Sequence, residues 1–224
     1  MHGEYPHDHT SYTQGLIWHD GKLYESTGQH GQSSLRRVDP QTGLTEAKRE
    51  LSTLQFGEGL ARVEDRLIQL TWRAGQAFAY DLETLEVVGQ HSYEGEGWGL
   101  CYDGRRLVMS DGSSDIYFRD PETFDVLDRL TVTIDDRPIQ RLNELECAEG
   151  WIYANVYQTD SIVRIDPGSG RVVAVIDAAG LLSTEDSVGV DVLNGIAYDP
   201  DRAIFYLTGK LWPKVFEVTF EESH

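Results

Sequence analysis

The sequence predicts an all-β protein folded as a five-bladed β-propeller. A short motif recurs five times, a charged turn and an apolar strand follow each copy, and no long segment has a helical period. A repeat of roughly 40 to 50 residues filled by short strands and turns is typical of propeller blades. We therefore expect one domain in residues 1–224, with units at 12–51, 56–93, 97–132, 142–182 and 193–220.

The recurring motif places a polar or aromatic residue before a glycine or glutamate, which an aliphatic residue follows. Its copies are 12–16 (YTQGL), 56–60 (FGEGL), 96–100 (EGWGL), 142–145 (LNEL) and 193–196 (LNGI). The strand after each copy is rich in Val, Ile, Tyr and Leu, as at 67–70 (LIQL). Such strands suit sheets that are buried against neighbouring blades.

The later parts of each unit add a third and a fourth strand. The third strand ends in aspartate and a turn, as at 35–43 (LRRVDPQTG) and 162–170 (IVRIDPGSG), where proline and glycine supply the turn dihedrals. Residues 177–184 are expected to form a short helix or a loop. The first ten residues are short for a strand that completes the fifth unit, so we expect a thin last blade or a trimmed chain.

The composition narrows the classes of partner. A net charge of -19 argues against nucleic acid, because phosphate binding needs clustered Lys and Arg. No apolar run approaches a membrane span, and the first residues lack the apolar core of a signal peptide. We expect a monomer. The two cysteines, Cys101 and Cys147, fall on neighbouring units and could pair, but we expect buried free thiols.

The motif also predicts where functional side chains gather. In a propeller the innermost strands line the central channel, and the residues at their starts meet at one mouth. The opening positions of the five units are Gln14, Glu58, Trp98, Asn143 and Asn194. The ends of the next strands add Glu25, Trp72, Asp111, Tyr157 and Lys210. Amide, carboxylate, lysine and large aromatic groups together are typical of a pocket for a small molecule or a chain end.

Eight segments, in order along nearly the whole chain, carry a resemblance to a known family. They are 13–16, 24–28, 56–60, 70–72, 96–100, 142–146, 193–197 and 208–213. With these segments the chain resembles the plant-type and bacterial glutaminyl-peptide cyclotransferases, or glutaminyl cyclases. The resemblance implies a five-bladed propeller that converts N-terminal glutamine of peptides and proteins to pyroglutamate and releases ammonia. It also implies an acyltransferase without a cofactor or catalytic metal, and a periplasmic or secreted location.

The resemblance implies roles for the pocket residues. Glu58 matches the proton-shuttling glutamate of the family, and Lys210 is expected to act with it in catalysis. The positions that match substrate-binding residues are Gln14, Trp72, Trp98, Asn143, Tyr157 and Tyr12. Tyr12 stands where the family more often has phenylalanine, and Tyr157 where tryptophan is usual. Both remain aromatic, so we expect altered affinity more than lost activity.

Two other functions remain open at this point. Calcium-dependent lactonases also gather acids and amides at a channel mouth, and in that case Glu58, Asn143 or Asp191 would hold the metal. A non-enzymatic scaffold would instead carry its aromatic residues on the outer rim. A structural calcium bound by channel carboxylates and carbonyls is also compatible with the sequence.

The remaining acids and histidines are expected to be structural. Glu144 and Glu146 are interpreted as hydrogen-bond acceptors between blades, and Glu25 and Asp111 as structural acids of the inner ring. The segment 7–9 (HDH) lacks further ligands at a suitable spacing, so we expect no metal there. For Glu58, indoles around the carboxyl would raise its pKa and Lys210 would lower it, and the sequence leaves that balance open.

Overall fold

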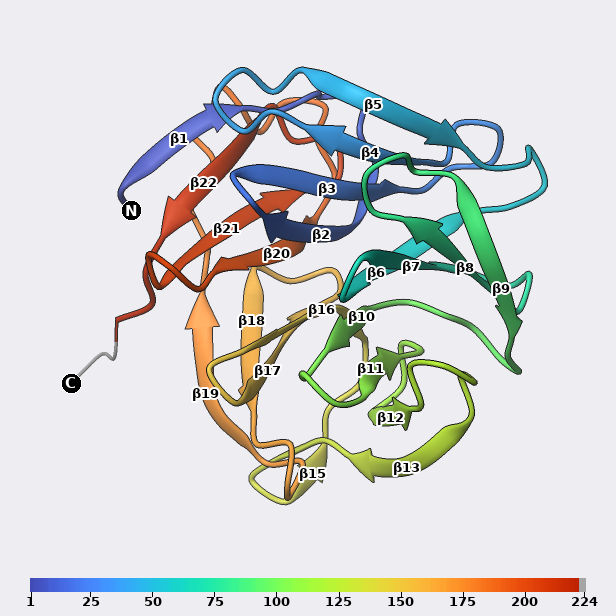
Figure 1. Ribbon diagram of the computed structural model, residues 1–224. Coiled ribbons are helices and arrows are strands. Elements are labelled where there is room, and N and C mark those ends of the chain that lie inside the picture. The colour runs from blue at the N-terminus through green and yellow to red at the C-terminus, as the bar shows by residue number, and fades with distance from the viewer. Residues whose placement is uncertain (222–224) are drawn as a thin grey trace.

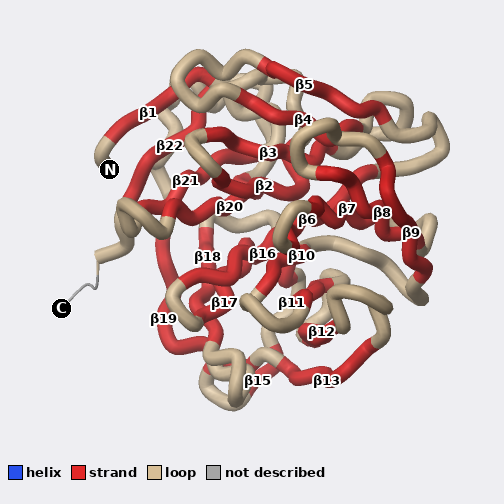
Figure 2. The backbone as a smooth tube through the Cα atoms, viewed as in Figure 1, coloured by secondary structure: helices blue, strands red, loops and turns tan. Residues whose placement is uncertain are grey.

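The protein, seen in a computed structural model that describes residues 1–221, consists of strands, turns and loops (Figures 1 and 2). These residues contain no helix, and they form five four-stranded antiparallel sheets arranged as blades around an axis. The strands β2, β6, β10, β16 and β20 contact one another around that axis. The prediction of an all-β, five-bladed β-propeller is therefore confirmed.

Each blade is an antiparallel sheet whose strands follow one another from the axis outward. Blade 1 contains β2 (Thr13–His19), β3 (Lys22–Thr27), β4 (Ser34–Val38) and β5 (Thr45–Glu50). Blade 2 contains β6 (Gly57–Val63), β7 (Arg66–Thr71), β8 (Gln76–Asp81) and β9 (Val87–Ser92). Blade 3 contains β10 (Leu100–Tyr102), β11 (Leu107–Ser110), β12 (Asp115–Arg119) and β13 (Val126–Thr131).

The remaining two blades differ in how they are completed. A hairpin of β14 (Thr133–Ile134) and β15 (Arg137–Pro138) precedes blade 4. Blade 4 contains β16 (Leu142–Ala148), β17 (Trp151–Val156), β18 (Ser161–Ile165) and β19 (Val172–Asp177). Blade 5 contains β20 (Leu193–Asp199), β21 (Ile204–Gly209), β22 (Lys214–Val218) and β1 (Gly3–Pro6). Residues 178–184 form a loop, so of the two predicted alternatives for this segment, a short helix or a loop, the loop is confirmed.

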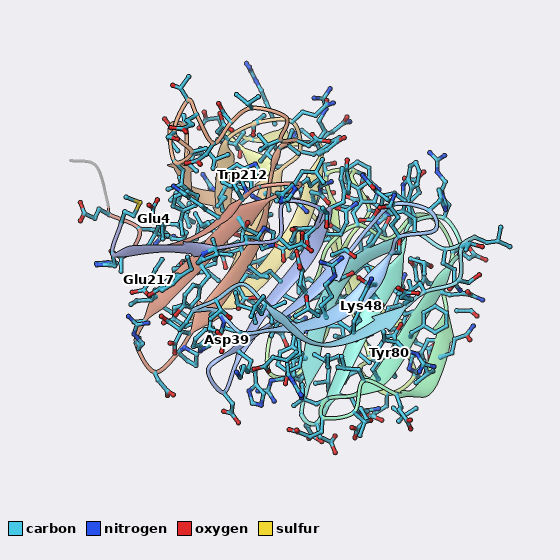
Figure 3. All side chains as sticks on the ribbon, turned by 90° about the horizontal axis from the view of Figure 1, so that it is seen from above. Glu4, Asp39, Lys48, Tyr80, Trp212 and Glu217 are labelled. Atoms are coloured by element: carbon cyan, nitrogen blue, oxygen red, sulfur yellow. A yellow bond between two sulfur atoms is a disulfide. The ribbon has the colours of Figure 1, made fainter. Side chains whose placement is uncertain are left out.

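Blade 5 is completed by the N-terminal strand, so the expectations that the last blade is thin and that the first ten residues are too short to complete it were wrong. β1 pairs antiparallel with β22, from Gly3 opposite Glu217 to Pro6 opposite Lys214. Figure 1 shows this pairing as a blue strand beside a red one, and Figure 3 labels Glu4 and Glu217 on the two strands. Four residues suffice because β22 itself has only five.

A buried ion pair holds the N-terminal segment where it leaves β1. The His7 ring places Nε2 3.0 Å from Oε1 of Glu25 and Nδ1 2.7 Å from the carbonyl oxygen of Trp212. Ser11 and Thr13 also donate hydrogen bonds to Glu25. Burial lowers the pKa of His7, but the Glu25 carboxylate, the Trp212 carbonyl and the charge of Asp8 together outweigh burial and the pKa is raised. Burial likewise raises the pKa of Glu25, but His7, with the charge of Arg36 and the hydrogen bond from Thr13, outweighs burial and the pKa is lowered.

The inner strands approach one another closely because the recurring motif provides glycines. A Cβ atom on Gly15 would lie 2.6 Å from the backbone nitrogen of Leu60, and one on Gly59 would lie 2.5 Å from that of Leu100. The strand register also shifts at the motif in β2, β6, β16 and β20, which is the mark of a bulge. A bulge redirects a side chain out of the regular alternation. The motif residue is thereby turned toward the channel mouth.

Hydrogen bonds join each blade to the next near the axis. Each of the five pairs of adjacent blades is joined by at least one such hydrogen bond. A buried apolar cluster also packs between the two blades of each pair. The donors and acceptors are Ser26 Oγ to Glu58 O, Gly59 N to Trp98 O, Ser110 Oγ to Asn143 O, Gly195 N to Asn155 Oδ1, and Asn194 Nδ2 to Thr13 O. The ring of blades is therefore closed by both polar and apolar contacts.

A disulfide joins blade 3 to blade 4, so the expectation of buried free thiols was wrong. Cys101 on β10 is bonded to Cys147 on β16, with Cα atoms 5.5 Å apart. Cys101 directly follows the motif of its unit and Cys147 lies two residues after the motif of the next unit, and the inner strands of these adjacent blades lie close enough to bridge. Two cysteines are too few for a disulfide framework, but they form one disulfide that links two adjacent blades.

The first prediction concerns the His7–Glu25 pair. Replacing His7 with alanine leaves the Glu25 charge buried and unpaired, so we expect the free energy of unfolding to fall by about 3–5 kcal/mol near pH 6. Because the folded pKa of His7 is raised, its contribution is complete below its ordinary pKa of 6.5 and is lost as the pH rises through the folded value. Urea unfolding across this range measures both effects.

The exposed His9 provides the matched control. His9→Ala should unfold at the same urea concentration as the wild type at every pH. A stability difference between wild type and His7→Ala that does not change with pH would contradict the ion-pair explanation.

The second prediction concerns the disulfide. A Cys101→Ala, Cys147→Ala double variant should lose about 2–4 kcal/mol of unfolding free energy, because the unfolded chain is no longer cross-linked. Urea unfolding with and without a reducing agent checks this. The reductant should destabilise the wild type and leave the double variant unchanged; a wild type that is indifferent to reduction would show that the bridge does not stabilise the fold.

Candidate active site

One cavity of about 270 Å³ collects the predicted site residues. It is lined by Tyr12, Gln14, Phe56, Glu58, Trp72, Trp98, Asn143, Tyr157 and Lys210, which we call the aromatic pocket. All eight residues that the sequence analysis assigned to catalysis or substrate binding are among these nine. The ninth, Phe56, was missed, although it is a large aromatic residue at the start of the motif that carries Glu58.

A chain of amide hydrogen bonds ends on the carboxyl group of Glu58. Gln14 donates from Nε2 to Oε1 of Glu58 over 3.1 Å. Asn194, which is fully buried behind the pocket, donates from Nδ2 to Oε1 of Gln14 over 3.3 Å and to the carbonyl oxygen of Thr13 over 2.9 Å. Asn194 therefore fixes which end of the Gln14 amide faces Glu58.

Burial dominates the electrostatics of the pocket. Desolvation raises the pKa of Glu58 well above its ordinary value, the charge of Lys210 opposes this shift, and the charge of Glu96 adds to it. Desolvation also lowers the pKa of Lys210, against the opposing charges of Glu58 and Asp191. For Glu58, the effect of burial on the pKa therefore outweighs the effect of the Lys210 charge, a balance that the sequence left open. The pKa values of Glu58 and Lys210 are both shifted toward neutral pH.

Lys210 lies between two tyrosine rings. Its Nζ atom is 4.9 Å from the ring centroids of both Tyr12 and Tyr157, within the range of a cation–π interaction. The hydroxyl of Tyr12 donates to Oδ2 of Asp191 over 3.1 Å, and backbone hydrogen bonds fix Lys210 to the segment 191–192. The tyrosines at these two positions therefore hold the lysine.

The walls of the pocket are aromatic rings from neighbouring blades. Phe56 lies 5.7 Å from Trp72, and Trp98 meets Tyr157 edge to face at 5.6 Å. Trp98 also packs on Gly112, where a Cβ atom would lie 2.6 Å from the indole and φ is +82°. Both indole nitrogens donate hydrogen bonds to Glu96, a residue inside the third motif that the sequence analysis did not single out.

Asn143 brings an unsatisfied polar atom to the pocket. The residue is 2% exposed, and its Oδ1 has no hydrogen-bond partner among the described residues. A buried carbonyl oxygen without a partner costs free energy unless a ligand supplies a donor. Asn143 is therefore suited to accept a hydrogen bond from an N–H group of a bound molecule.

The other predicted acids lie outside the pocket. Glu144 accepts hydrogen bonds from the backbone nitrogens of Leu16 in blade 1 and Ile196 in blade 5, so the interpretation as an acceptor between blades is confirmed. Glu25 pairs with His7, and Asp111 accepts a hydrogen bond from the backbone nitrogen of Ser113 over 2.9 Å.

In residues 1–221 no group of three or more His, Cys, Asp or Glu side chains is placed to hold a metal ion. No helix in this part of the chain is long and apolar enough to cross a membrane.

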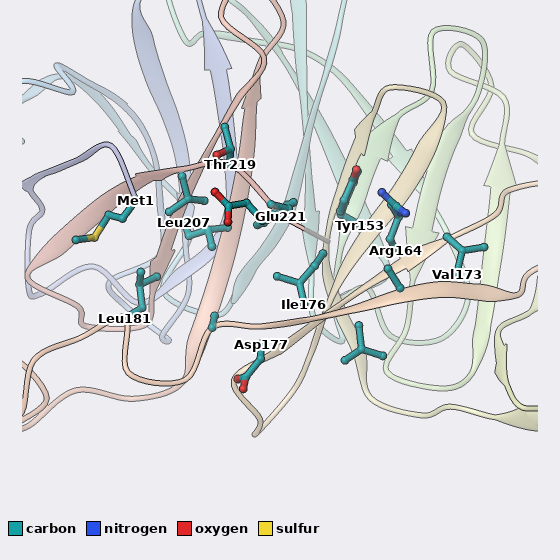
Figure 4. A pocket seen from close by; sticks show the side chains of 15 residues that line it. Met1, Tyr153, Arg164, Val173, Ile176, Asp177, Leu181, Leu207, Thr219 and Glu221 are labelled. Atoms are coloured by element: carbon teal, nitrogen blue, oxygen red, sulfur yellow. The ribbon is translucent and has the colours of Figure 1, made fainter. Parts of the chain in front are cut away.

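A larger cavity of about 690 Å³ lies between blades 4 and 5 (Figure 4). Val173, Ile176 and Leu181 are among its lining residues, with Tyr153 and Arg164. None of the eight predicted site residues lines it. The aromatic pocket is the better candidate although it is smaller, because a carboxyl, a lysine and two amides converge there within aromatic walls.

Comparison with known proteins gives matches along nearly the whole chain. The family profile described as glutamine cyclotransferase matches residues 1–220. The chain is 41% identical over 226 residues to a glutaminyl-peptide cyclotransferase of Arabidopsis thaliana, a match that covers 98% of this chain and 70% of that protein.

Solved structures agree with these matches. The glutaminyl cyclase of Myxococcus xanthus is 39% identical and superposes with a TM-score of 0.88, covering 98% of this chain and 94% of that one. Hydrazine synthase of Kuenenia stuttgartiensis, at 15% identity and a TM-score of 0.54 over 93% of this chain and 58% of that one, shares the fold alone.

The third prediction tests the coupling between the two charged pocket groups. The Lys210 charge lowers the pKa of Glu58, so Lys210→Met should raise that pKa further. Carbon-13 NMR titration of the Glu58 carboxyl, assigned with Glu58→Gln, measures the change. Lys214→Met removes a lysine that pairs with Glu4 and Asp186 instead, and should leave the titration unchanged. Equal shifts in both variants would contradict a local interaction.

Proposed function

This chain belongs to the glutamine cyclotransferase family and is a glutaminyl-peptide cyclotransferase, and we propose that Glu58 carries the proton in its reaction. The substrate is a peptide or protein with N-terminal glutamine, and the products are the pyroglutamyl peptide and ammonia. The observation that carries the assignment is the burial of one carboxyl group, hydrogen-bonded by Gln14, in a pocket with aromatic walls and one lysine.

The reaction needs a single proton to move between two nitrogens of the substrate. The α-amino nitrogen attacks the side-chain amide carbon, a C–N bond forms, and the carbonyl oxygen becomes negative. Glu58 takes a proton from the attacking nitrogen and gives it to the amide nitrogen. The second C–N bond then breaks, ammonia leaves, and the lactam carbonyl forms. General acid–base catalysis of this kind contributes roughly 10²–10⁴ in rate.

The raised pKa of Glu58 suits both halves of this transfer. A carboxyl group with its ordinary pKa is a weak base and holds a proton poorly at neutral pH, whereas a raised pKa improves both roles. A free α-amino group titrates near pKa 7.7–8.0, so part of the substrate is already neutral and nucleophilic at mild pH. Gln14 occupies Oε1, and we assign the transfer to Oε2.

The other pocket residues orient the substrate and stabilise its charge. We assign Lys210 to the developing negative oxygen, where a well-placed donor contributes roughly 3–4 kcal/mol. The unpartnered Oδ1 of Asn143 would accept an N–H of the substrate. The aromatic walls confine the glutamine side chain in the pocket beside the Glu58 carboxyl group.

We also propose that the reaction uses no catalytic metal and that the enzyme acts as a monomer. The donor set supports the first point, because Glu58 is the one carboxylate among the nine described lining residues and shares the pocket with a cation. Asp191, which a calcium-dependent lactonase would use as a ligand, is engaged by the Tyr12 hydroxyl. The disulfide fits an oxidising compartment such as the periplasm or the exterior.

The fourth prediction tests the proton carrier. Glu58→Gln should reduce ammonia release from a short peptide with N-terminal glutamine at least about a hundredfold, because the amide keeps the shape but cannot carry the proton. The wild-type rate should be unchanged by a chelator. Thermal unfolding of the variant serves as the control for folding. A folded Glu58→Gln enzyme with wild-type activity would refute the assignment, and inhibition by chelation would refute metal independence.

A further inference from the structure

Glu96 has no role in the reaction above, yet the two largest walls of the aromatic pocket meet at its carboxyl group. Its Oε2 accepts a hydrogen bond from Nε1 of Trp72 at 2.7 Å and one from Nε1 of Trp98 at 3.0 Å. Its Oε1 accepts from Nε of Arg73 at 2.8 Å. One side chain thus joins two indoles that are 26 residues apart in the sequence.

The two indoles belong to different blades. Trp72 directly follows β7 of blade 2, and Trp98 precedes β10 of blade 3. Backbone hydrogen bonds from Gly97 to Trp72 and from Gly59 to Trp98 fix the main chain at both positions. These bonds leave the side-chain torsions of the tryptophans free, so the backbone alone does not set the angle between the two rings.

The carboxylate of Glu96 supplies that missing constraint. Hydrogen bonds to an ionised acceptor are stronger than neutral ones. Burial raises the pKa of Glu96, but the bonds from Trp98, Arg73 and Trp72 outweigh it and the pKa is lowered, so the group is ionised at neutral pH. The Cζ atom of the Arg73 guanidinium also lies over the Trp72 ring, 3.8 Å from its centroid, so that Arg73 contacts the face of this indole while Glu96 binds its N–H.

Resting on the function proposed above, we propose that Glu96 is a positioning residue that sets the spacing between Trp72 and Trp98 for the glutamine side chain. It touches neither the reacting nitrogens nor the amide carbon, and it acts only through the two indoles. Walls that hold the substrate equally in the ground state and the transition state affect KM rather than kcat. The proposal therefore requires a specific kinetic signature.

Two substitutions separate the reach of this side chain from its charge. Glu96→Gln keeps the length and loses the charge, whereas Glu96→Asp keeps the charge and is one methylene too short to reach both indoles. Both variants should raise KM for a glutaminyl peptide about tenfold or more, the value of one hydrogen bond to a charged group. In both, kcat should stay within about threefold of the wild type.

Glu122→Gln is the matched control, since it also removes one Arg–Glu ion pair, with Arg66, but outside the pocket. Its KM and kcat should equal those of the wild type. A wild-type KM in Glu96→Asp would show that Glu96 acts through its charge alone, and a wild-type KM in both Glu96 variants would show that it is a surface ion pair. Either result overturns the proposal, as does a loss confined to kcat.

A spectroscopic measurement tests the inference independently of activity. The indole N–H signals of Trp72 and Trp98, assigned in nitrogen-15 NMR spectra with Trp72→Phe and Trp98→Phe, should move upfield together in Glu96→Asp and Glu96→Gln, and stay in place in Glu122→Gln. If the wild type releases no ammonia, the proposed function fails but these spectra still decide whether Glu96 anchors both indoles. Unmoved signals would refute the anchoring.

Discussion

The close approach of the five inner strands around the axis is the constraint on which the rest of this structure depends. At Gly59 and Gly99 a side chain would collide with the backbone of the next blade. The bulges at the same motif turn the preceding residue out of the sheet and toward the channel mouth. The packing that closes the propeller therefore also builds the floor of the active site, and a change that loosens one would disturb the other.

Blade 4 solves the same packing problem with a different residue. Where the other units have glycine after the pocket residue, this unit has Glu144, and its carboxyl reaches the backbone nitrogens of Leu16 and Ile196. Burial raises the pKa of Glu144 well above its ordinary value, and the nearby Glu146 adds to the shift. One side chain in the interior thus ties blade 4 to blades 1 and 5, next to Asn143 of the pocket.

Burial has a different net effect on the pKa values of two pairs of ionisable groups, Glu58 with Lys210 and His7 with Glu25. In the aromatic pocket, burial shifts the pKa values of Glu58 and Lys210 toward neutral pH, which suits Glu58 to proton transfer. For His7 and Glu25 the pKa values shift in the direction that favours the charged forms, because each group stabilises the charge of the other. The His7 ring also contacts the carbonyl oxygen of Trp212, a residue labelled in Figure 3 that lies two positions after Lys210. The strand that completes blade 5 is thereby connected to the segment that carries the catalytic lysine.

The sequence by itself determined the propeller and eight of the nine pocket residues. Seven of these followed from a motif that recurs once per blade and so places equivalent residues around one axis, and the eighth, Tyr12, followed from the family resemblance. Tertiary structure alone decided the completion of blade 5 by β1, the Cys101–Cys147 bond and the partners of Glu96. These features join chain segments that are far apart or equally able to remain unpaired, so no local pattern specifies them. The pKa of Glu58 belongs to the same class, since it depends on how completely other blades exclude water from one carboxyl group.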